Sequence, residues 1–211
     1  MSFLLEEEKE CPACKYPNKV DVWSIVNVKE DPELKDLLLG GELNMTECAS
    51  CKHIFYAEHF IIYHESDREL MAFVYPLASA QDAQKWIDKT AIDFTVFQAS
   101  TEAGSALNYK PVTLFGLEDL VQLVQKEEEM NVQSEIVKTL ADQGNFSTKT
   151  LRAGKARELG LPLVLPLAGE GEPRDRVKKG VEEVLKINDR LFVYRDLLAQ
   201  LENGQHERID L

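Results

Sequence analysis

The pattern of hydrophobic and polar positions in the first third of the chain predicts the strands of a sheet. Both faces of the segment 20–28 are largely apolar, with four valines on one face and Trp23 and Ile25 on the other. This pattern is typical of a strand that is covered on both sides. Turn-forming residues at 65–68 separate two further apolar runs, which favours a hairpin. Strands are therefore expected at residues 20–28, 41–46, 53–64 and 70–75, and a short arm or strand at residues 1–10.

After these strands, the spacing of apolar residues predicts helices. One further short helix is expected earlier, between two of the predicted strands. Asp31 is a candidate N-cap, Pro32 suits the first helical position, and Gly40 with Gly41 would end this short helix. Residues 101–110 are expected to form a loop, and the proline-led run 111–115 an edge strand. Longer helices are predicted at residues 79–97, 117–130, 132–141 and 174–201.

The C-terminal third differs in its pattern. Glycines and prolines punctuate residues 145–175, so this stretch should be irregular, with 161–167 as an extended segment. In the helix predicted at 174–201, apolar residues recur every seven positions. Such a stripe either closes the core of the monomer or pairs with a second copy, which makes a homodimer through this helix possible.

Four cysteines form two C-x2-C pairs, CPAC and CASC, far apart along the chain. Cys11 and Cys14 make the first pair, and Cys48 and Cys51 the second. One tight turn can direct both sulfurs of such a pair at one ion, and two turns supply the four ligands of a closed structural zinc site. Iron in a rubredoxin-like site is the rival, because it also uses two C-x2-C pairs. The sequence therefore predicts Zn²⁺, with Fe as the alternative ion.

Other chemistries have weaker support. Disulfides are disfavoured, because residues 1–10 do not resemble a secretory signal, and the cytoplasm is the expected compartment. Redox catalysis would need only one C-x-x-C pair. Among the histidines, His53 lies close to Cys51, while His59 and His64 should face opposite sides of one strand. We expect no catalytic residue and no bound organic cofactor, so the protein is not expected to be an enzyme.

The formal net charge of −13 bears on the choice of partner. Residues 1–144 hold 12 Lys and Arg against 26 Asp and Glu, whereas residues 145–211 hold 12 against 11. Binding to nucleic acid requires a basic face that neutralises phosphates, so an acidic cysteine-bearing part makes this partner unfavourable. No apolar run approaches the ~20 residues of a membrane helix, so a membrane association is not expected either.

The cysteine region resembles a known family. The segments CPAC, VWSIVNVKEDPELKDLLLGGELNMTECASC and IIYHESDRELMAFVYP are similar to the CpXC proteins of bacteria and archaea. The resemblance covers residues 8–78 and thins to about residue 140. Ala49 replaces the proline of the second family motif, which leaves the ligand role of Cys48 and Cys51 intact. The resemblance implies a metal-binding domain and implies no enzymatic activity.

These observations predict an α+β fold: a zinc-ribbon-like antiparallel sheet with an inserted short helix, followed by packed helices. We expect three parts: a CpXC zinc-ribbon-like domain at 1–78, a helical extension at 79–144, and an irregular segment with an amphipathic helix at 145–211. The predicted function is binding or scaffolding around a structural zinc. Electron transfer through iron and binding of nucleic acid remain the alternatives, and a protein partner is unidentified.

Overall fold

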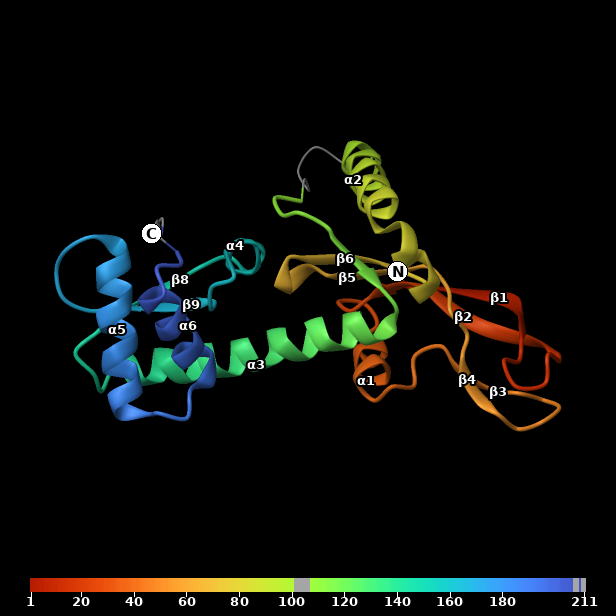
Figure 1. Cartoon of the computed structure of the whole chain (residues 1–211), viewed down its shortest axis with the longest axis horizontal. Coiled ribbons are helices and arrows are strands. Elements are labelled where there is room, and N and C mark those ends of the chain that lie inside the picture. The colour runs from red at the N-terminus through yellow and green to blue at the C-terminus, as the bar shows by residue number, and fades with distance from the viewer. Residues whose placement is uncertain (101–106, 207–208, 210–211) are drawn as a thin grey trace. The chain divides into compact units, whose positions relative to one another are not determined.

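The chain forms an α+β structure with two compact units, as seen in the computed structural model that describes residues 1–100, 107–206 and 209 (Figure 1). The units are Met1–Gln125 and Lys126–Leu211. The α+β class predicted from the sequence is confirmed. The predicted three-part division at residues 78 and 144 stays a prediction. None of the described helices combines the length and the apolar run that crossing a bilayer requires.

A five-stranded sheet organises the first unit, with the strands in the order β1-β2-β5-β6-β7. The strands are β1 (Phe3–Glu10), β2 (Pro17–Asn27), β5 (Ile61–Glu65), β6 (Leu70–Tyr75) and β7 (Val112–Phe115). The pairs β1–β2 and β5–β6 are antiparallel, but β2–β5 and β6–β7 are parallel, so the sheet is mixed and not antiparallel throughout as expected. Parallel neighbours need long connections, and helices occupy both of these connections.

Helices cover the two faces of this sheet (Figure 1). On one face, α1 (Glu33–Leu39) and the first turns of α3 (Leu117–Ala141) pack their buried leucines against alternate residues of β2, β5 and β6. On the other face, Phe94 of α2 (Ala83–Ser100) packs against the aromatic side of β6. Both faces of the sheet are thus buried in part, as the apolar pattern of residues 20–28 predicted.

Two boundaries between elements differ from expectation. The strand predicted at 53–64 is two strands, β4 (Ile54–Tyr56) and β5, because β4 turns back onto β3 (Met45–Glu47) while β5 joins the main sheet. The helices predicted at 117–130 and 132–141 are one helix, α3, since no glycine or proline interrupts them. The edge strand expected at 111–115 is confirmed as β7. The first six residues of the loop predicted at 101–110 lie outside the described residues.

The predicted N-cap of α1 is also wrong. The carboxylate of Asp31 accepts a hydrogen bond from the N–H of Ser2, at 3.2 Å, and makes no side-chain cap to α1. Hydrogen bonds from the side chain and from the N–H of Ser2, a residue 29 positions away, lower the pKa of Asp31. A tertiary contact has therefore replaced a local one.

The second unit packs helices around a two-stranded antiparallel sheet. Its elements after α3 are β8 (Ser147–Thr150), α4 (Ala153–Leu159), β9 (Val164–Leu167), α5 (Pro173–Ile187) and α6 (Phe192–Glu202). The extended segment expected at 161–167 contains β9. Gly180 permits α5 to lie against β9, because a Cβ there would meet the carbonyl oxygen of Pro166 at 2.2 Å. The helix predicted at 174–201 is wrong: it is divided at Asn188, where the backbone is extended.

The heptad stripe of this C-terminal region is buried inside the second unit. Val177, Val184 and Leu191 are at most 2% exposed and belong to one core cluster, and the fourth member of the stripe, Leu198, is partly buried against it. Of the two roles that the stripe allowed, closing the monomer core accounts for these side chains. Pairing with a second copy stays a prediction.

Candidate metal centre

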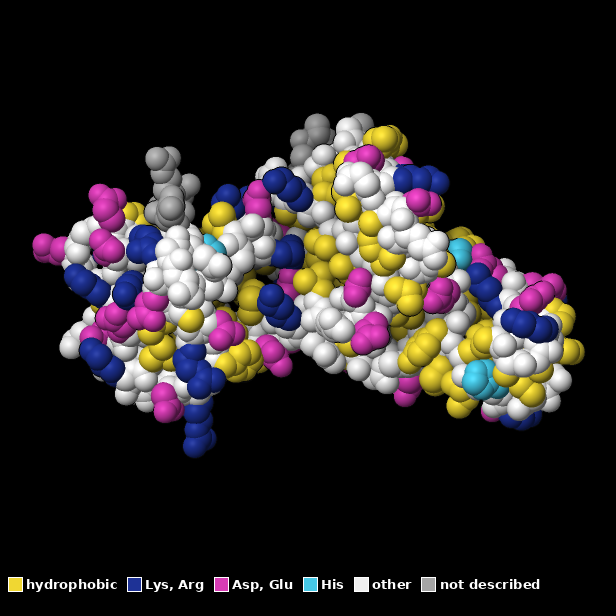
Figure 2. Space-filling view, viewed as in Figure 1, with side chains coloured by type: hydrophobic (Ala, Val, Ile, Leu, Met, Phe, Trp, Pro, Cys, Tyr) yellow, Lys and Arg dark blue, Asp and Glu magenta, His cyan; other side chains and the backbone are white. Residues whose placement is uncertain are grey.

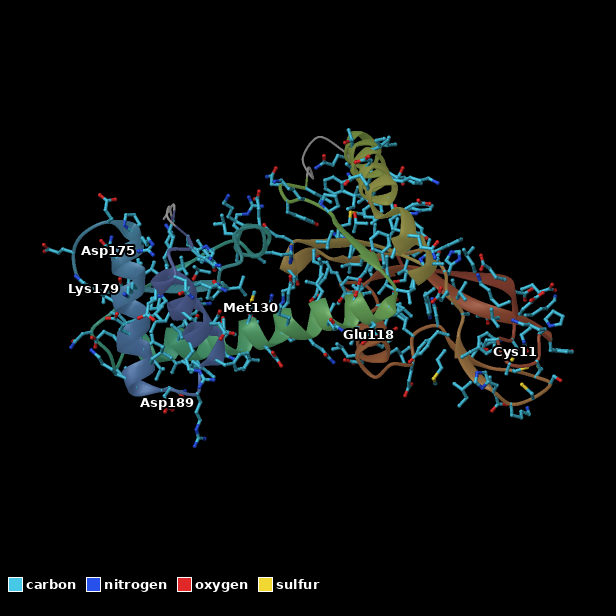
Figure 3. The ribbon with its side chains drawn as sticks, viewed as in Figure 1. Cys11, Glu118, Met130, Asp175, Lys179 and Asp189 are labelled. Carbon is cyan, nitrogen blue, oxygen red and sulfur yellow. The ribbon has the colours of Figure 1, made fainter. Side chains whose placement is uncertain are left out.

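The four cysteines meet at one end of the first unit. Cys11 and Cys14 lie between β1 and β2, and Cys48 and Cys51 lie between β3 and β4. The four sulfurs all lie within 4.8 Å of one another. The Sγ atoms of Cys11 and Cys51 are 3.7 Å apart, and those of Cys14 and Cys48 are 3.6 Å apart. Figure 3 shows Cys11 at the end of β1 with further sulfur atoms beside it.

These separations fit a four-coordinate ion and exclude disulfides. A zinc–sulfur bond of about 2.3 Å in a tetrahedron places the sulfurs about 3.8 Å apart, whereas bonded sulfurs lie about 2.05 Å apart. All four cysteines are free thiols. The cluster could therefore hold a metal ion, and a tetrahedral iron of similar bond length would fit the same thiols.

The two C-x2-C turns have the same backbone hydrogen bonds. We define the first knuckle as Cys11–Tyr16 and the second knuckle as Cys48–His53. In the first knuckle, the N–H of Lys15 donates to the carbonyl of Cys11 and the N–H of Cys11 donates to the carbonyl of Tyr16, both at 2.9 Å. The second knuckle repeats both bonds with Lys52, Cys48 and His53, at 3.0 and 2.9 Å.

A lysine completes each knuckle in the left-handed conformation. The φ angles of Lys15 and Lys52 are 60° and 62°. Glycine adopts such angles without steric cost, whereas a residue with a Cβ is strained there. Each lysine thus provides the turn at some cost. Lys52 also pairs with Glu47 at 2.9 Å, a hydrogen bond that raises the pKa of Lys52.

The sulfurs differ in exposure and in ease of ionisation. Cys11 and Cys48 are fully buried against Phe55, whereas Cys14 and Cys51 are exposed. The N–H groups of Cys51 and Ser50 lower the pKa of Cys48 to about 6. The N–H of His53 lowers the pKa of Cys51, but nearby sulfurs and burial raise it more, to about 12. The thiolate is the form that binds metal, and the two N–H groups favour this form at Cys48.

Asn18 joins the two knuckles, and sequence reasoning missed it. Its side-chain amide donates to the carbonyl of Tyr16 at 2.8 Å and approaches the Sγ of Cys48 at 3.7 Å. Its Oδ1 accepts the N–H of Ala49 at 2.9 Å. Asn18 is 5% exposed, but nothing in the sequence indicated this, because Asn18 precedes the strand predicted at 20–28.

Asn44 is a second residue of this kind. Its Oδ1 accepts the N–H of Trp23 at 2.7 Å, and its Nδ2 donates to the carbonyl of Trp23 at 3.1 Å. Its own carbonyl accepts the N–H of Ala57 at 2.8 Å. The side chain of Asn44 thereby imitates a strand partner for β2 and holds the base of the β3–β4 hairpin.

The histidines do not join the thiol cluster. The side chain of His53 is exposed, and its backbone carbonyl accepts a hydrogen bond from Cys48. The Nδ1 of His59 lies 3.1 Å from a carboxylate oxygen of Glu7. His64 lies on β5, where its Nε2 is 3.1 Å from the hydroxyl of Tyr109. His59 and His64 were expected on one strand, but His59 precedes β5.

A cavity of about 470 Å³ lies elsewhere in the first unit, and no cysteine lines it. Its walls come from α1, β4, the end of β6 and the first turns of α3. On the face drawn in Figure 2, hydrophobic side chains gather over this region. Two of the polar side chains at its wall have partners: Tyr56 donates to the carbonyl of Gly41, and Asp119 accepts the N–H of Phe115. This lining does not identify a ligand.

Comparison with known proteins gives one match. The family model described as CpXC protein matches residues 10–138, which include all four cysteines and most of the first unit. No curated protein and no solved structure matches the chain.

Proposed function

The chain belongs to the CpXC protein family, and from that premise we propose that it is a binding or scaffold protein whose cysteine domain is held together by one structural zinc ion. The ligands in this proposal are Cys11, Cys14, Cys48 and Cys51. The observation that carries it is the gathering of four sulfurs from two remote turns within 4.8 Å of one another.

A structural role follows from the number of ligands. Four sulfurs complete a tetrahedral zinc site and leave no position for water or substrate. The ion would connect the loop of the β1–β2 hairpin to the loop of the β3–β4 hairpin, which belong to different sheets. The proposed zinc therefore stabilises the arrangement of two hairpins and performs no chemistry.

The alternatives differ from zinc in measurable ways. Iron in the same four thiols would make an electron-transfer centre, and the sulfur separations accept it equally well. Binding of nucleic acid has less support, because the first unit holds 10 Lys and Arg against 21 Asp and Glu.

We also propose the cytoplasm as the compartment, since four free thiols suit a reducing environment.

Elemental analysis of the protein purified from its own source tests the metal. We expect one zinc per chain and a colourless protein. A red protein with reversible reduction would support iron instead. X-ray absorption of the zinc-loaded protein should give four sulfur ligands and no oxygen ligand. A solvent molecule bound to the zinc would contradict the structural role.

Ligand variants test the residue assignment. Cys14→Ser should lose metal and lower the unfolding temperature. Ser50→Ala, within the second knuckle but without a ligand, is the matched control and should retain one zinc per chain. Full metal content and unchanged thermal stability in Cys14→Ser would contradict the proposal.

A further inference from the structure

A second cavity lies in the first unit under α2, away from the thiol cluster. Its volume is about 590 Å³, within the range of ligand sites. Its floor is formed by two rows of residues across the strands β2, β5 and β6. The rows are Ile25–Ile62–Phe73 and Asn27–His64–Met71, each aligned by the strand register. Val96, Phe97 and Asp93 of α2 line the cavity from the opposite side.

The second row gives this apolar cavity a polar strip. The Oδ1 of Asn27 is buried and accepts no hydrogen bond within the part of the chain that the structure describes. Buried polar atoms in proteins are almost always paired, so an acceptor without a donor indicates a missing partner. Beside it in the register, the Nε2 of His64 lies 3.1 Å from the hydroxyl of Tyr109. The Oδ1 atom itself has almost no accessible surface, so the side chain of Asn27 must turn toward the cavity to meet a ligand. An N–H or O–H group on the ligand would then supply the donor that Asn27 lacks.

The charged groups around the cavity indicate an uncharged ligand. Burial lowers the pKa of His64, so the imidazole is neutral near pH 7 and offers no cation to an anionic ligand. Asp93 is paired with Lys89, and the terminal amino group of Met1 is paired with Glu30. The excess of carboxylates in the first unit repels anions as well. An uncharged molecule avoids both the repulsion and the loss of hydration that a buried charge would suffer.

We propose that the cavity between α2 and the strands β2, β5 and β6 binds a neutral, largely apolar small molecule that carries one hydrogen-bond donor. The apolar row and Met71 contact the body of the molecule, and Asn27 accepts its donor. This site is independent of the proposed zinc, because no cysteine lines it.

N-Phenyl-1-naphthylamine is a suitable probe, since it is neutral and aromatic, has one N–H, and fluoresces strongly in apolar surroundings. We expect saturable binding of one probe per chain to the metal-loaded full-length protein. Its anionic relative 8-anilinonaphthalene-1-sulfonate should bind about tenfold more weakly or worse. Equal or tighter binding of the sulfonate would overturn the assignment to a neutral ligand.

Variants locate the probe. Ile62→Trp fills the floor and should abolish binding, whereas Ile54→Trp, on β4 outside the cavity, is the matched control and should bind as the parent does. Val96 is 64% exposed, so Val96→Trp narrows the cavity without disturbing the core and should also weaken binding. Asn27→Leu removes the acceptor at similar volume and should cost about tenfold in affinity.

Metal content and circular dichroism are measured for every variant, so that loss of the fold or of the zinc is distinguished from loss of this site. Parent-like binding by both tryptophan variants within the cavity would overturn the proposal. Unchanged affinity in Asn27→Leu would overturn the role of the donor. Fluorescence that rises only with formation of a dimer would show that a second copy, and not a small molecule, covers this face.

Discussion

The two knuckles have the same backbone but different anchors. The first knuckle closes β1 and β2, which pair over eight positions and belong to the five-stranded sheet. The second knuckle closes β3 and β4, which pair over three positions and form a separate sheet. An isolated short hairpin is marginally stable in water. One ion can therefore contribute unequally to the stability of two turns, although each turn supplies two of its four ligands.

The largest expected effect comes from removing a ligand. In Cys48→Ala the site loses a buried sulfur, and we expect the β3–β4 hairpin to lose its order while β1 and β2 stay paired. Amide exchange in Met45–Tyr56 should rise by about a hundredfold or more, because the metal contributes its binding free energy to local folding. Hydrogen exchange read by mass spectrometry, with metal content measured in parallel, checks this.

Cys11→Ala is the matched variant in the other knuckle. It should also leave β1 and β2 paired while the β3–β4 hairpin loses protection. The reason is that either change removes the ion that both knuckles share. Equal loss of protection in β1–β2 and in β3–β4 would contradict the unequal anchoring.

Asn44 should have the next largest effect. In Asn44→Ala, the N–H and the carbonyl of Trp23 lose their partners, and the left-handed φ of 56° becomes unfavourable. We expect a loss of about 2–3 kcal/mol in unfolding free energy, measured by denaturant titration. Asn44→Gly separates the two causes, because it keeps the backbone conformation. If Asn44→Gly is as stable as the parent, the side-chain bonds to β2 are not what holds the hairpin.

A smaller effect is expected for Asn18, which connects the knuckles directly. Asn18→Leu leaves the N–H of Ala49 and the carbonyl of Tyr16 without this partner. We expect a loss of about 1–2 kcal/mol and about tenfold weaker zinc binding, as for residues that orient metal ligands. Competition with a chromogenic chelator measures the affinity. An unchanged affinity would show that the two knuckles reach the metal independently.

The smallest effect concerns the left-handed lysines. Replacing Lys15 or Lys52 with glycine removes Cβ strain but increases the freedom of the unfolded chain, so each change should stabilise by at most about 1 kcal/mol. Lys52→Gly also removes the pair with Glu47, so its gain should be the smaller one. Thermal unfolding of the two variants, compared with Lys19→Gly in β2 as a destabilised control, checks the order. A loss of stability in Lys15→Gly would contradict strain at this turn.

Much of the metal centre was predictable, because its ligands are recognised from residues close together along the chain. A C-x2-C spacing is enough to place two sulfurs on one turn, so four ligand candidates could be named without knowledge of the fold. The two apolar faces of β2, the proline and glycines that bound α1, and the helical spacing in α2 were equally visible. The predicted helix at 174–201 failed because a heptad pattern continued through a backbone turn at Asn188, and the strand at 53–64 failed because an apolar run does not show which strand each part will pair with.

The supporting polar contacts could not be predicted from spacing. Asn18 and Ala49 are 31 residues apart, Asn44 and Trp23 are 21 apart, and Asp31 and Ser2 are 29 apart. Such pairs depend on the register between remote strands. No local pattern encodes that register, because it is set by which faces of the sheet become buried.

The amino-acid sequence by itself determined the identity of the four thiols, the acidic character of the first unit and the α+β class, since these depend on composition and on residues close along the chain. Only the tertiary structure decided that β2 and β5 pair in parallel, that Asn27 lies beside His64 in a cavity, and that the heptad stripe is buried within the second unit. The physical reason is that burial depends on contacts between segments that are remote along the chain. The stable fold is the one in which their apolar surfaces pack together and exclude water.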